Sequence, residues 1–173
     1  MEDVYSICLI PAQEDEKYLS DIIKDLCEKH RVPTFVPHIT IYGDIKVDFD
    51  KLRNTTENSM RGISSFTVRP DGINHSDVFF KTVFIDIRRS KILKSLHKKL
   101  REELIQYKDF ILDPHISLIY KNIPTKERVR IVRNLTIKKK YTINQVAIFT
   151  PKNKQRGWYD VARWEICYRK KFG

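Results

Sequence analysis

The sequence predicts an α+β protein of two similar lobes that form a single domain over all 173 residues. Segments typical of strands and of amphipathic helices alternate along the chain. The order strand, helix, strand occurs twice, over residues 4–45 and 78–120, which indicates an internal duplication. In the first repeat His38 lies 33 residues after Tyr5, and in the second His115 lies 33 residues after Thr82. The length suits one domain with a sizeable core, and no linker divides the repeats.

Each repeat ends in a short motif of the form Pro-His-x-(Thr/Ser). The first copy contains His38 and Thr40, and the second contains His115 and Ser117. β-Branched and aromatic residues surround both copies, which favours extended structure. Because alternate side chains of a strand share a face, each imidazole should point to the same side as the hydroxyl two residues later. Such polar pairs in apolar strands indicate a functional site.

The first repeat opens with a buried strand at residues 4–10, which Pro11 ends. An acidic turn then begins a helix that closes on basic residues, as suits the helix dipole. The helix has one apolar face with helical spacing, formed by Leu19, Ile22, Ile23, Leu26 and Cys27. The first histidine strand follows at 38–45. A weaker helix over 48–60 and a short strand over 66–68 complete this half.

The second repeat is preceded by a predicted loop at residues 69–77, rich in turn-forming residues, in which His75 is expected to be exposed and uninvolved. Residues 78–87 form the strongest predicted strand of the chain. Ser90 can cap the next helix, whose apolar face includes His97, so we interpret this histidine as structural. The second histidine strand, at 115–120, ends the repeat.

The C-terminal part is predicted to contain a short helix from residue 125 and then a β-hairpin. Residues 141–150 and 159–168 have the composition of strands, and a basic turn at 151–157 joins them. Three side chains of the second strand should share one face: Trp164, Ile166 and Tyr168.

The composition is strongly basic, with 33 Lys and Arg against 22 Asp and Glu and a formal net charge of +11. This balance suits RNA or a phosphate-bearing substrate, although lysines also keep a surface solvated. No run approaches the roughly 20 apolar residues of a membrane span, and the acidic start does not resemble a signal peptide. We therefore expect a cytoplasmic, monomeric protein with no membrane partner, whose three separated cysteines stay reduced.

Two histidines on equivalent strands predict paired acid–base catalysis with no cofactor and no metal. An imidazole has an ordinary pKa of about 6.5, so near neutral pH one histidine can accept a proton while the other donates one. Cleavage of a phosphodiester needs this division, because the attacking water loses a proton and the leaving oxygen gains one. Thr40 and Ser117 can supply hydrogen-bond donors to the phosphate oxygens. Signatures of zinc sites, phosphate-binding loops and serine hydrolases are missing from the sequence.

The paired motifs resemble those of the two-histidine (2H) phosphoesterase superfamily, and more closely those of the plant and yeast-type cyclic nucleotide phosphodiesterases. The resemblance covers most of the chain. The matching segments are residues 4–6, 35–40, 79–80, 83–84, 114–118 and 120, and the terminal pair Trp164-Glu165. It implies a bilobal fold with a central cleft, in which each lobe is an antiparallel-rich sheet backed by helices.

The same resemblance implies the reaction and some of the binding residues. The expected substrates are nucleoside 2′,3′-cyclic phosphates, hydrolysed to 2′-phosphates, and ADP-ribose 1″,2″-cyclic phosphate, hydrolysed to ADP-ribose 1″-phosphate. These reactions belong to the processing of a by-product of tRNA splicing. By resemblance the hydroxyls of Thr40 and Ser117 are catalytic and bind substrate, while Phe80 and Tyr120 hold the base.

The resemblance also divides the labour between the catalytic histidines. His115 is expected to be the base that activates water, and His38 the acid that protonates the leaving 3′ oxygen. The motifs are nearly symmetric, so the residues alone leave this order open.

Other functions use the same residues or the same charge. A 2H enzyme acting on RNA ends or on 2′,5′-phosphodiesters would suit the basic excess, and RNA end-joining reverses the same chemistry. An RNA-binding module with a decayed site would use the basic hairpin and exposed aromatics, but the intact motif residues argue against decay. A purely structural role for the motifs is disfavoured, because two buried imidazoles and two hydroxyls would all need partners.

Overall fold

In the computed structural model, residues 3–151 and 164–173 are described. Within these ranges the chain contains strands and α-helices, together with one 3₁₀ turn, η1 (Phe79–Lys81). The elements are, in order, β1 (Val4–Pro11), α1 (Gln13–His30), β2 (Ile39–Lys46), α2 (Phe49–Met60), β3 (Phe66–Val68), β4 (Pro70–His75), β5 (Val83–Ile87), α3 (Lys91–Leu104), β6 (His115–Ile119), α4 (Thr125–Asn134), β7 (Tyr141–Pro151) and β8 (Trp164–Lys171).

The strands form two antiparallel sheets, one for each repeat. The larger sheet has the order β2-β1-β7-β3, with β8 also paired to β7, and the smaller has the order β4-β5-β6. In each repeat the first strand pairs with its histidine strand, β1 with β2 and β5 with β6. Strand β1 lies between β2 and β7, and its alternate side chains pack into a separate apolar cluster on each face of the sheet, which is why its run of apolar residues is almost entirely buried. The predicted bilobal α+β fold is confirmed.

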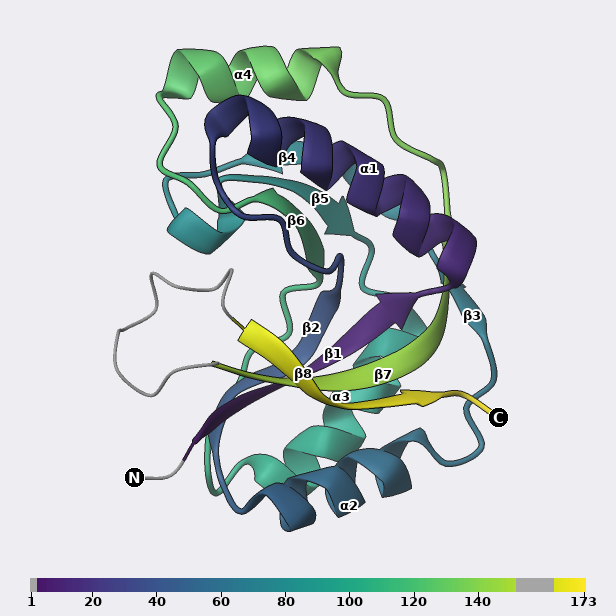
Figure 1. Cartoon of the computed structure of the whole chain (residues 1–173). Coiled ribbons are helices and arrows are strands. Elements are labelled where there is room, and N and C mark those ends of the chain that lie inside the picture. Colours follow the sequence, from purple (N-terminus) through teal and green to yellow (C-terminus); the bar gives the residue numbers. More distant parts are fainter. Residues whose placement is uncertain (1–2, 152–163) are drawn as a thin grey trace.

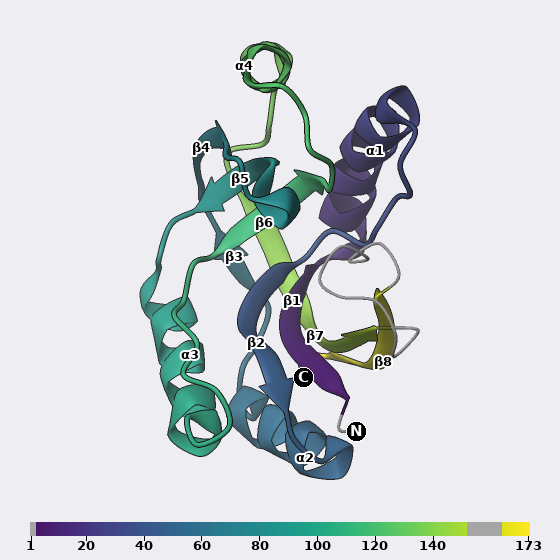
Figure 2. The same ribbon diagram turned by 90° about the vertical axis from the view of Figure 1, so that its left-hand side faces the viewer.

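Each repeat's helix packs on the histidine strand of the other repeat. Helix α1 contacts β6, and α3 contacts β2. As a result α1 and α4 lie with the smaller sheet, while α2 and α3 lie beside the larger sheet at the other end of the molecule (Figures 1 and 2). The apolar face predicted for α1 is the one it buries, through residues such as Leu19, Ile23 and Leu26.

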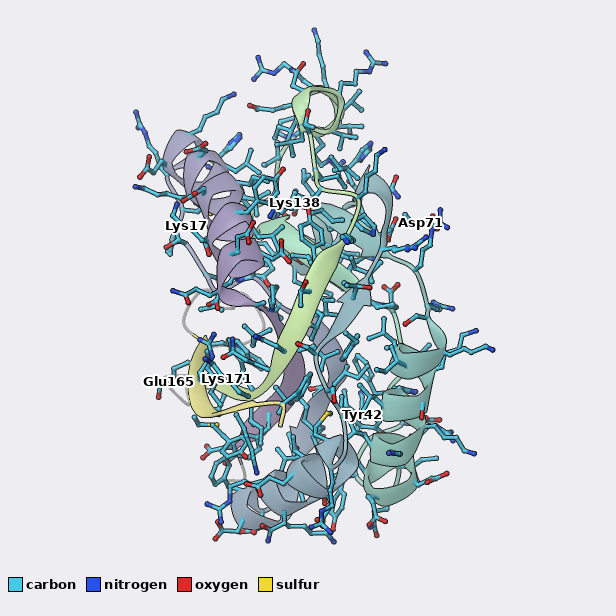
Figure 3. The ribbon with its side chains drawn as sticks, turned by 90° about the vertical axis from the view of Figure 1, so that its right-hand side faces the viewer. Lys17, Tyr42, Asp71, Lys138, Glu165 and Lys171 are labelled. Carbon is cyan, nitrogen blue, oxygen red and sulfur yellow. The ribbon has the colours of Figure 1, made fainter. Side chains whose placement is uncertain are left out.

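Polar contacts tie α1 to the larger sheet. Lys138 lies alongside α1 (Figure 3) and its ammonium donates to a carboxylate oxygen of Asp15 at 2.9 Å. The other oxygen of Asp15 accepts from the backbone N–H of Thr142 at 2.7 Å, at the start of β7. The buried carboxylate is therefore paired and hydrogen-bonded, as a buried charge requires.

The strand predicted over residues 78–87 is shorter than expected, because its first part is the 3₁₀ turn η1. Two side chains bond to the backbone there and replace ladder hydrogen bonds. The hydroxyl of Ser76 donates to the carbonyl of Lys81 at 2.6 Å, and that of Thr82 donates to the carbonyl of Phe79 at 2.9 Å. Strand pairing begins at Val83. Phe80 therefore lies in a turn and not on a strand face with Thr82.

The loop predicted over residues 69–77 is largely the edge strand β4, which pairs with β5. Pro70 is tolerated because it begins an edge strand, and Gly72, with a φ of 123°, lies at a shift in register. His75 lies on this strand and is half-buried, not in an exposed loop.

The predicted C-terminal hairpin is confirmed for its described part, since β7 and β8 pair antiparallel. Along β8, the side chains of Trp164, Ile166 and Tyr168 are less exposed than their neighbours, as alternation predicted. The basic turn after Pro151 and the predicted strand start at 159–163 lie outside the described residues. In the described part of the chain, no helix combines the length and apolar composition needed to cross a membrane.

Candidate active site

Both histidine motifs line one cleft of about 500 Å³. His38, one residue before β2, and Thr40 come from the larger sheet. His115 and Ser117, on β6, come from the smaller sheet. Within each motif the imidazole and the hydroxyl therefore reach the same space, as the alternation of a strand predicts. The sequence-predicted residues lie together although 77 positions separate the two histidines.

The two imidazoles are held in the same way. Nδ1 of His38 lies 2.7 Å from the carbonyl oxygen of Val36, and Nδ1 of His115 lies 2.7 Å from the carbonyl oxygen of Asp113. Because a carbonyl oxygen only accepts, Nδ1 carries the hydrogen in each neutral ring. This arrangement leaves Nε2 as the proton acceptor of each ring and as the nitrogen free for chemistry.

Burial makes His38 reluctant to hold a charge. It lowers the pKa of this imidazole to about 4, against an opposing effect of the hydrogen bond to Val36. The nearby His115 lowers the pKa of His38 further, since two positive charges in one cleft repel. His38 is therefore neutral in the resting protein near pH 7, and its protonated form gives up a proton more readily than an ordinary imidazolium.

Burial also lowers the pKa of His115, but charged groups surround this ring. The ammonium of Lys81 lowers its pKa, whereas the carboxylates of Asp113 and Asp86 raise it. Oδ2 of Asp113 lies 3.9 Å from Nδ1 of His115 and accepts a hydrogen bond from Lys81 at 2.6 Å. A carboxylate behind the ring stabilises an imidazolium once a proton has been taken up.

The two hydroxyls already have partners in the cleft. The oxygen of Thr40 lies 3.6 Å from the sulfur of Cys8, whose pKa burial raises to about 12, so the thiol stays protonated. The hydroxyl of Ser117 donates to the carbonyl of Phe80 at 2.6 Å. Ser117 can donate to a phosphate only after its hydroxyl turns away from that carbonyl, a rotation about one bond.

Aromatic side chains gather at one end of the cleft. Tyr120 follows the last residue of β6, and its ring stacks on that of Phe35 with centroids 3.9 Å apart. Phe80 also lines the cleft and is 41% exposed, an unusual exposure for a large apolar ring. The Phe80 ring is thus accessible to a ligand, whereas Tyr120 is buried behind Phe35. Trp164 of β8 lines the cleft as well.

Sequence reasoning missed three residues that line the cleft: Phe35, Asp44 and Lys108. Phe35 belongs to the first motif segment but received no role. Asp44 and Lys108 line the cleft and form an ion pair with 2.9 Å between Nζ and Oδ2. A Gly-Asp pair inside a predicted strand signals an irregular backbone, and this was the available clue to Asp44. Lys108 carried no such signal, because a single lysine in a loop is ordinarily a solvated surface residue.

The remaining histidines lie outside the cleft. Nε2 of His97 lies 2.8 Å from the carbonyl oxygen of Phe110, and the ring stacks on Tyr42, so it is structural as predicted. His30 is buried at the end of α1, where burial lowers its pKa. Over residues 3–151 and 164–173, no cluster of three or more His, Cys, Asp or Glu side chains could hold a metal ion.

Residues 4–162 match the family of cyclic phosphodiesterase-like proteins. The chain belongs to this family. The family match and the paired motifs identify this cyclic phosphodiesterase-like protein as a 2H phosphoesterase, an enzyme that acts on phosphodiesters.

Individual relatives are distant in sequence. A cyclic phosphodiesterase from Arabidopsis thaliana is 23% identical over 127 residues, which cover 73% of this chain and 70% of the relative. Escherichia coli LigT, solved with 3′-AMP, shares 16% identity at a TM-score of 0.63 over 99% of both chains. TT0787 from Thermus thermophilus shares 12% identity at a TM-score of 0.63 over 98% of this chain and 97% of its own. The two structures share the fold of this cyclic phosphodiesterase-like protein.

Proposed function

We propose that the protein is a metal-independent cyclic phosphodiesterase. It hydrolyses nucleoside 2′,3′-cyclic phosphates to 2′-phosphates, and ADP-ribose 1″,2″-cyclic phosphate to ADP-ribose 1″-phosphate. The observation that carries the proposal is the pair of imidazoles in one cleft, each tied through Nδ1 to its own backbone. Two fixed rings with free Nε2 atoms suit a reaction that needs one base and one acid.

In the proposed reaction, Nε2 of His115 takes a proton from water. The water oxygen attacks phosphorus and the bond from phosphorus to the 3′ oxygen breaks. The leaving 3′ oxygen takes a proton from Nε2 of His38, which yields the 2′-phosphate. Asp113 supports His115 as the base, because its carboxylate faces the imidazolium that forms. His38 suits the acid, since the protein stabilises its charge poorly and its proton is readily given up.

The bound substrate itself favours protonation of His38, the proposed acid. A cyclic phosphate carries a negative charge, and a negative charge beside an imidazole favours the protonated form. Thr40 and Ser117 would donate hydrogen bonds to the phosphate oxygens as charge builds on them. The exposed ring of Phe80 offers a face on which a base can stack, which tolerates any base. The name of the A. thaliana relative and the binding of 3′-AMP by LigT support a nucleotide substrate.

The pH profile of kcat/KM should be a bell with its maximum on the acidic side of about pH 6.5, the pKa of a free imidazole. The productive form has one protonated and one neutral ring. Burial lowers the pKa of both His38 and His115, so the doubly neutral form dominates from a lower pH upward. The kcat profile should lie at higher pH, because bound phosphate favours protonation. Steady-state kinetics at constant ionic strength measures both, and a kcat/KM that rises through neutral pH would contradict the assignment.

Turnover of adenosine 2′,3′-cyclic phosphate in EDTA tests the proposed function. We expect full activity after chelation, since imidazoles perform both proton transfers, and phosphorus NMR should identify adenosine 2′-phosphate as the product. ADP-ribose 1″,2″-cyclic phosphate, assayed in parallel, should give ADP-ribose 1″-phosphate. Loss of activity on chelation that a divalent ion restores would replace this mechanism with a metal-dependent one. A 3′-phosphate product would show that the bond from phosphorus to the 2′ oxygen breaks instead.

A further inference from the structure

The cleft continues past the histidines, away from its aromatic end. Strand β2 runs from the histidine motif to Gly43 and Asp44, which line the cleft with Lys108 and Phe110. The loop that contains Lys108 and Phe110 comes before β6 in the chain, whereas Tyr120 follows that strand. The histidines therefore lie between two ends of the cleft. The aromatic end is formed around the stacked rings of Phe35 and Tyr120. The other end holds the ion pair of Lys108 and Asp44, and we call it the polar end; its residues are Ser6, Gly43, Asp44, Lys108 and Phe110.

The backbone at the polar end departs from a regular strand. The pairing of β1 with β2 changes register on both sides of Ile7, opposite this part of β2. Asp44 has a φ of 62°, in the left-handed region that glycine favours and that aspartate adopts more often than most other residues. A conformation of this kind costs free energy and persists where surrounding contacts enforce it, often at a binding site. Here it accompanies a carboxylate directed to Lys108.

Lys108 is held in place but keeps capacity to bind. Its backbone carbonyl accepts a hydrogen bond from the hydroxyl of Tyr42, a residue of β2 whose ring stacks on His97 of α3 (Figure 3). Its ammonium contacts Asp44 at 2.9 Å, which uses one of three N–H donors. The Lys108 side chain is 42% exposed, against 26% for Asp44, so the remaining donors face solvent and cleft.

Gly43 packs closely against three side chains of the cleft wall. A β-carbon at residue 43 would lie 3.2 Å from a ring carbon of Phe110, 3.2 Å from the methyl of Thr40 and 3.3 Å from the hydroxyl of Ser6. These three side chains line the cleft, so a larger residue at this position would displace part of the cleft wall beside Thr40. The absence of a side chain lets Phe110, Thr40 and Ser6 pack against the backbone of Gly43, between the catalytic centre and the polar end.

The stereochemistry of a ribose cyclic phosphate matches a cleft with two ends. The base is attached at C1′ and the 5′ carbon at C4′, and the cyclic phosphate joins C2′ and C3′ between them. When the cyclic phosphate meets the histidines and the base stacks at the aromatic end, the 5′ substituent leaves toward the polar end. A partly exposed ammonium is suited to bind a phosphate there.

We propose that Lys108 binds a second phosphate, carried on the 5′ oxygen of the cyclic-phosphate substrate. This inference rests on the proposed function. The shared chemistry is a 5′-phosphoryl group, which a 5′-phosphorylated mononucleotide, the preceding nucleotide of an RNA end or a diphosphate would each supply. Asp44 is a positioning residue that holds the ammonium at the cleft wall.

The test compares adenosine 2′,3′-cyclic phosphate with its 5′-phosphorylated form and with a dinucleotide that ends in a 2′,3′-cyclic phosphate. In the natural protein, kcat/KM should be about 10-fold higher for the 5′-phosphorylated form, mainly through a lower KM. A higher value for the dinucleotide than for the 5′-phosphorylated form would point to an RNA end. The reverse order would point to a mononucleotide or diphosphate.

Lys108→Ala should bring the ratio of kcat/KM between phosphorylated and unphosphorylated substrates close to one, and Lys108→Arg should retain the preference. Lys98→Ala is the matched control, because Lys98 is a 79% exposed lysine on α3, outside the cleft. A natural protein without preference for the 5′-phosphate, or a Lys108→Ala variant that keeps it, would overturn the inference. Circular dichroism of each variant confirms that the fold is intact.

A binding measurement separates this inference from the proposed function. Calorimetry with adenosine 2′-phosphate and adenosine 2′,5′-bisphosphate needs no turnover. Tighter binding of the bisphosphate that Lys108→Ala abolishes would support the subsite even if no cyclic phosphate were hydrolysed. Equal binding of both ligands, in a protein that hydrolyses the cyclic phosphate, would retain the proposed function and refute the subsite.

Discussion

Replacement of either His38 or His115 by alanine should lower kcat by about 10²–10⁴-fold while the protein stays folded, because each imidazole performs one proton transfer. Each imidazole is hydrogen-bonded through Nδ1 to the carbonyl two residues upstream, and the carboxylate of Asp113 also lies near His115. Removal of a ring that is disfavoured in its charged form leaves no buried charge unpaired. Stability should therefore change much less than the rate.

His75→Ala provides the matched control. His75 is half-buried on β4 and does not line the cleft, so its loss should leave kcat within a few-fold of the natural value. Steady-state rates with a cyclic nucleotide, together with thermal unfolding, measure both effects. Near-normal turnover by His38→Ala or by His115→Ala would remove that histidine from the mechanism. Equal losses in all three variants would indicate a general effect on folding.

The centre of the candidate site was predictable because its geometry is local. In a strand, residues two apart share a face, so a His-x-(Thr/Ser) motif already specifies where its hydroxyl lies relative to its imidazole. The repeated order of elements then predicted that both motifs occupy equivalent places. That they line one cleft is a tertiary fact, and it agrees with the duplication.

Features that depend on competing local bonds were not predictable in the same way. Residues 78–87 have strand-forming composition throughout, yet Ser76 and Thr82 bond the backbone of the turn that contains Phe80. That turn presents the Phe80 ring to the cleft. Tyr120 reaches the cleft because β6 ends one residue earlier, at Ile119, and a regular strand would have turned it away from His115.

The spacing of apolar residues also could not predict which sheet each helix packs on. An apolar stripe shows which face a helix buries but not which sheet covers it. Helix α1 packs on β6 and α3 on β2, so each repeat completes the lobe of the other. This exchange brings the loop before β6 against β2, where Lys108 meets Asp44. No pattern within either segment alone indicates that contact.

A substrate with a very good leaving group should rescue His38→Ala far more than His115→Ala. An aryl phosphodiester such as bis(4-nitrophenyl) phosphate releases a phenolate that is stable without a proton, so the acid becomes dispensable. The attacking water still needs a base, which the proposed mechanism assigns to His115 with Asp113 behind it. The expected loss in His38→Ala falls to about 10-fold or less, while the loss in His115→Ala stays at about 10²–10⁴-fold.

The same comparison decides the order of the roles. Each variant is assayed with the aryl diester and with a cyclic nucleotide, and the two losses are expressed relative to the natural protein. Before substrate binds, the charges around the rings favour a proton on His115 more than on His38. The assignment of His38 as the acid therefore depends on the bound phosphate, which favours protonation of His38. Selective rescue of His115→Ala would make His115 the acid and His38 the base. Equal rescue of both variants would refute any fixed division, because each histidine would then serve in either role.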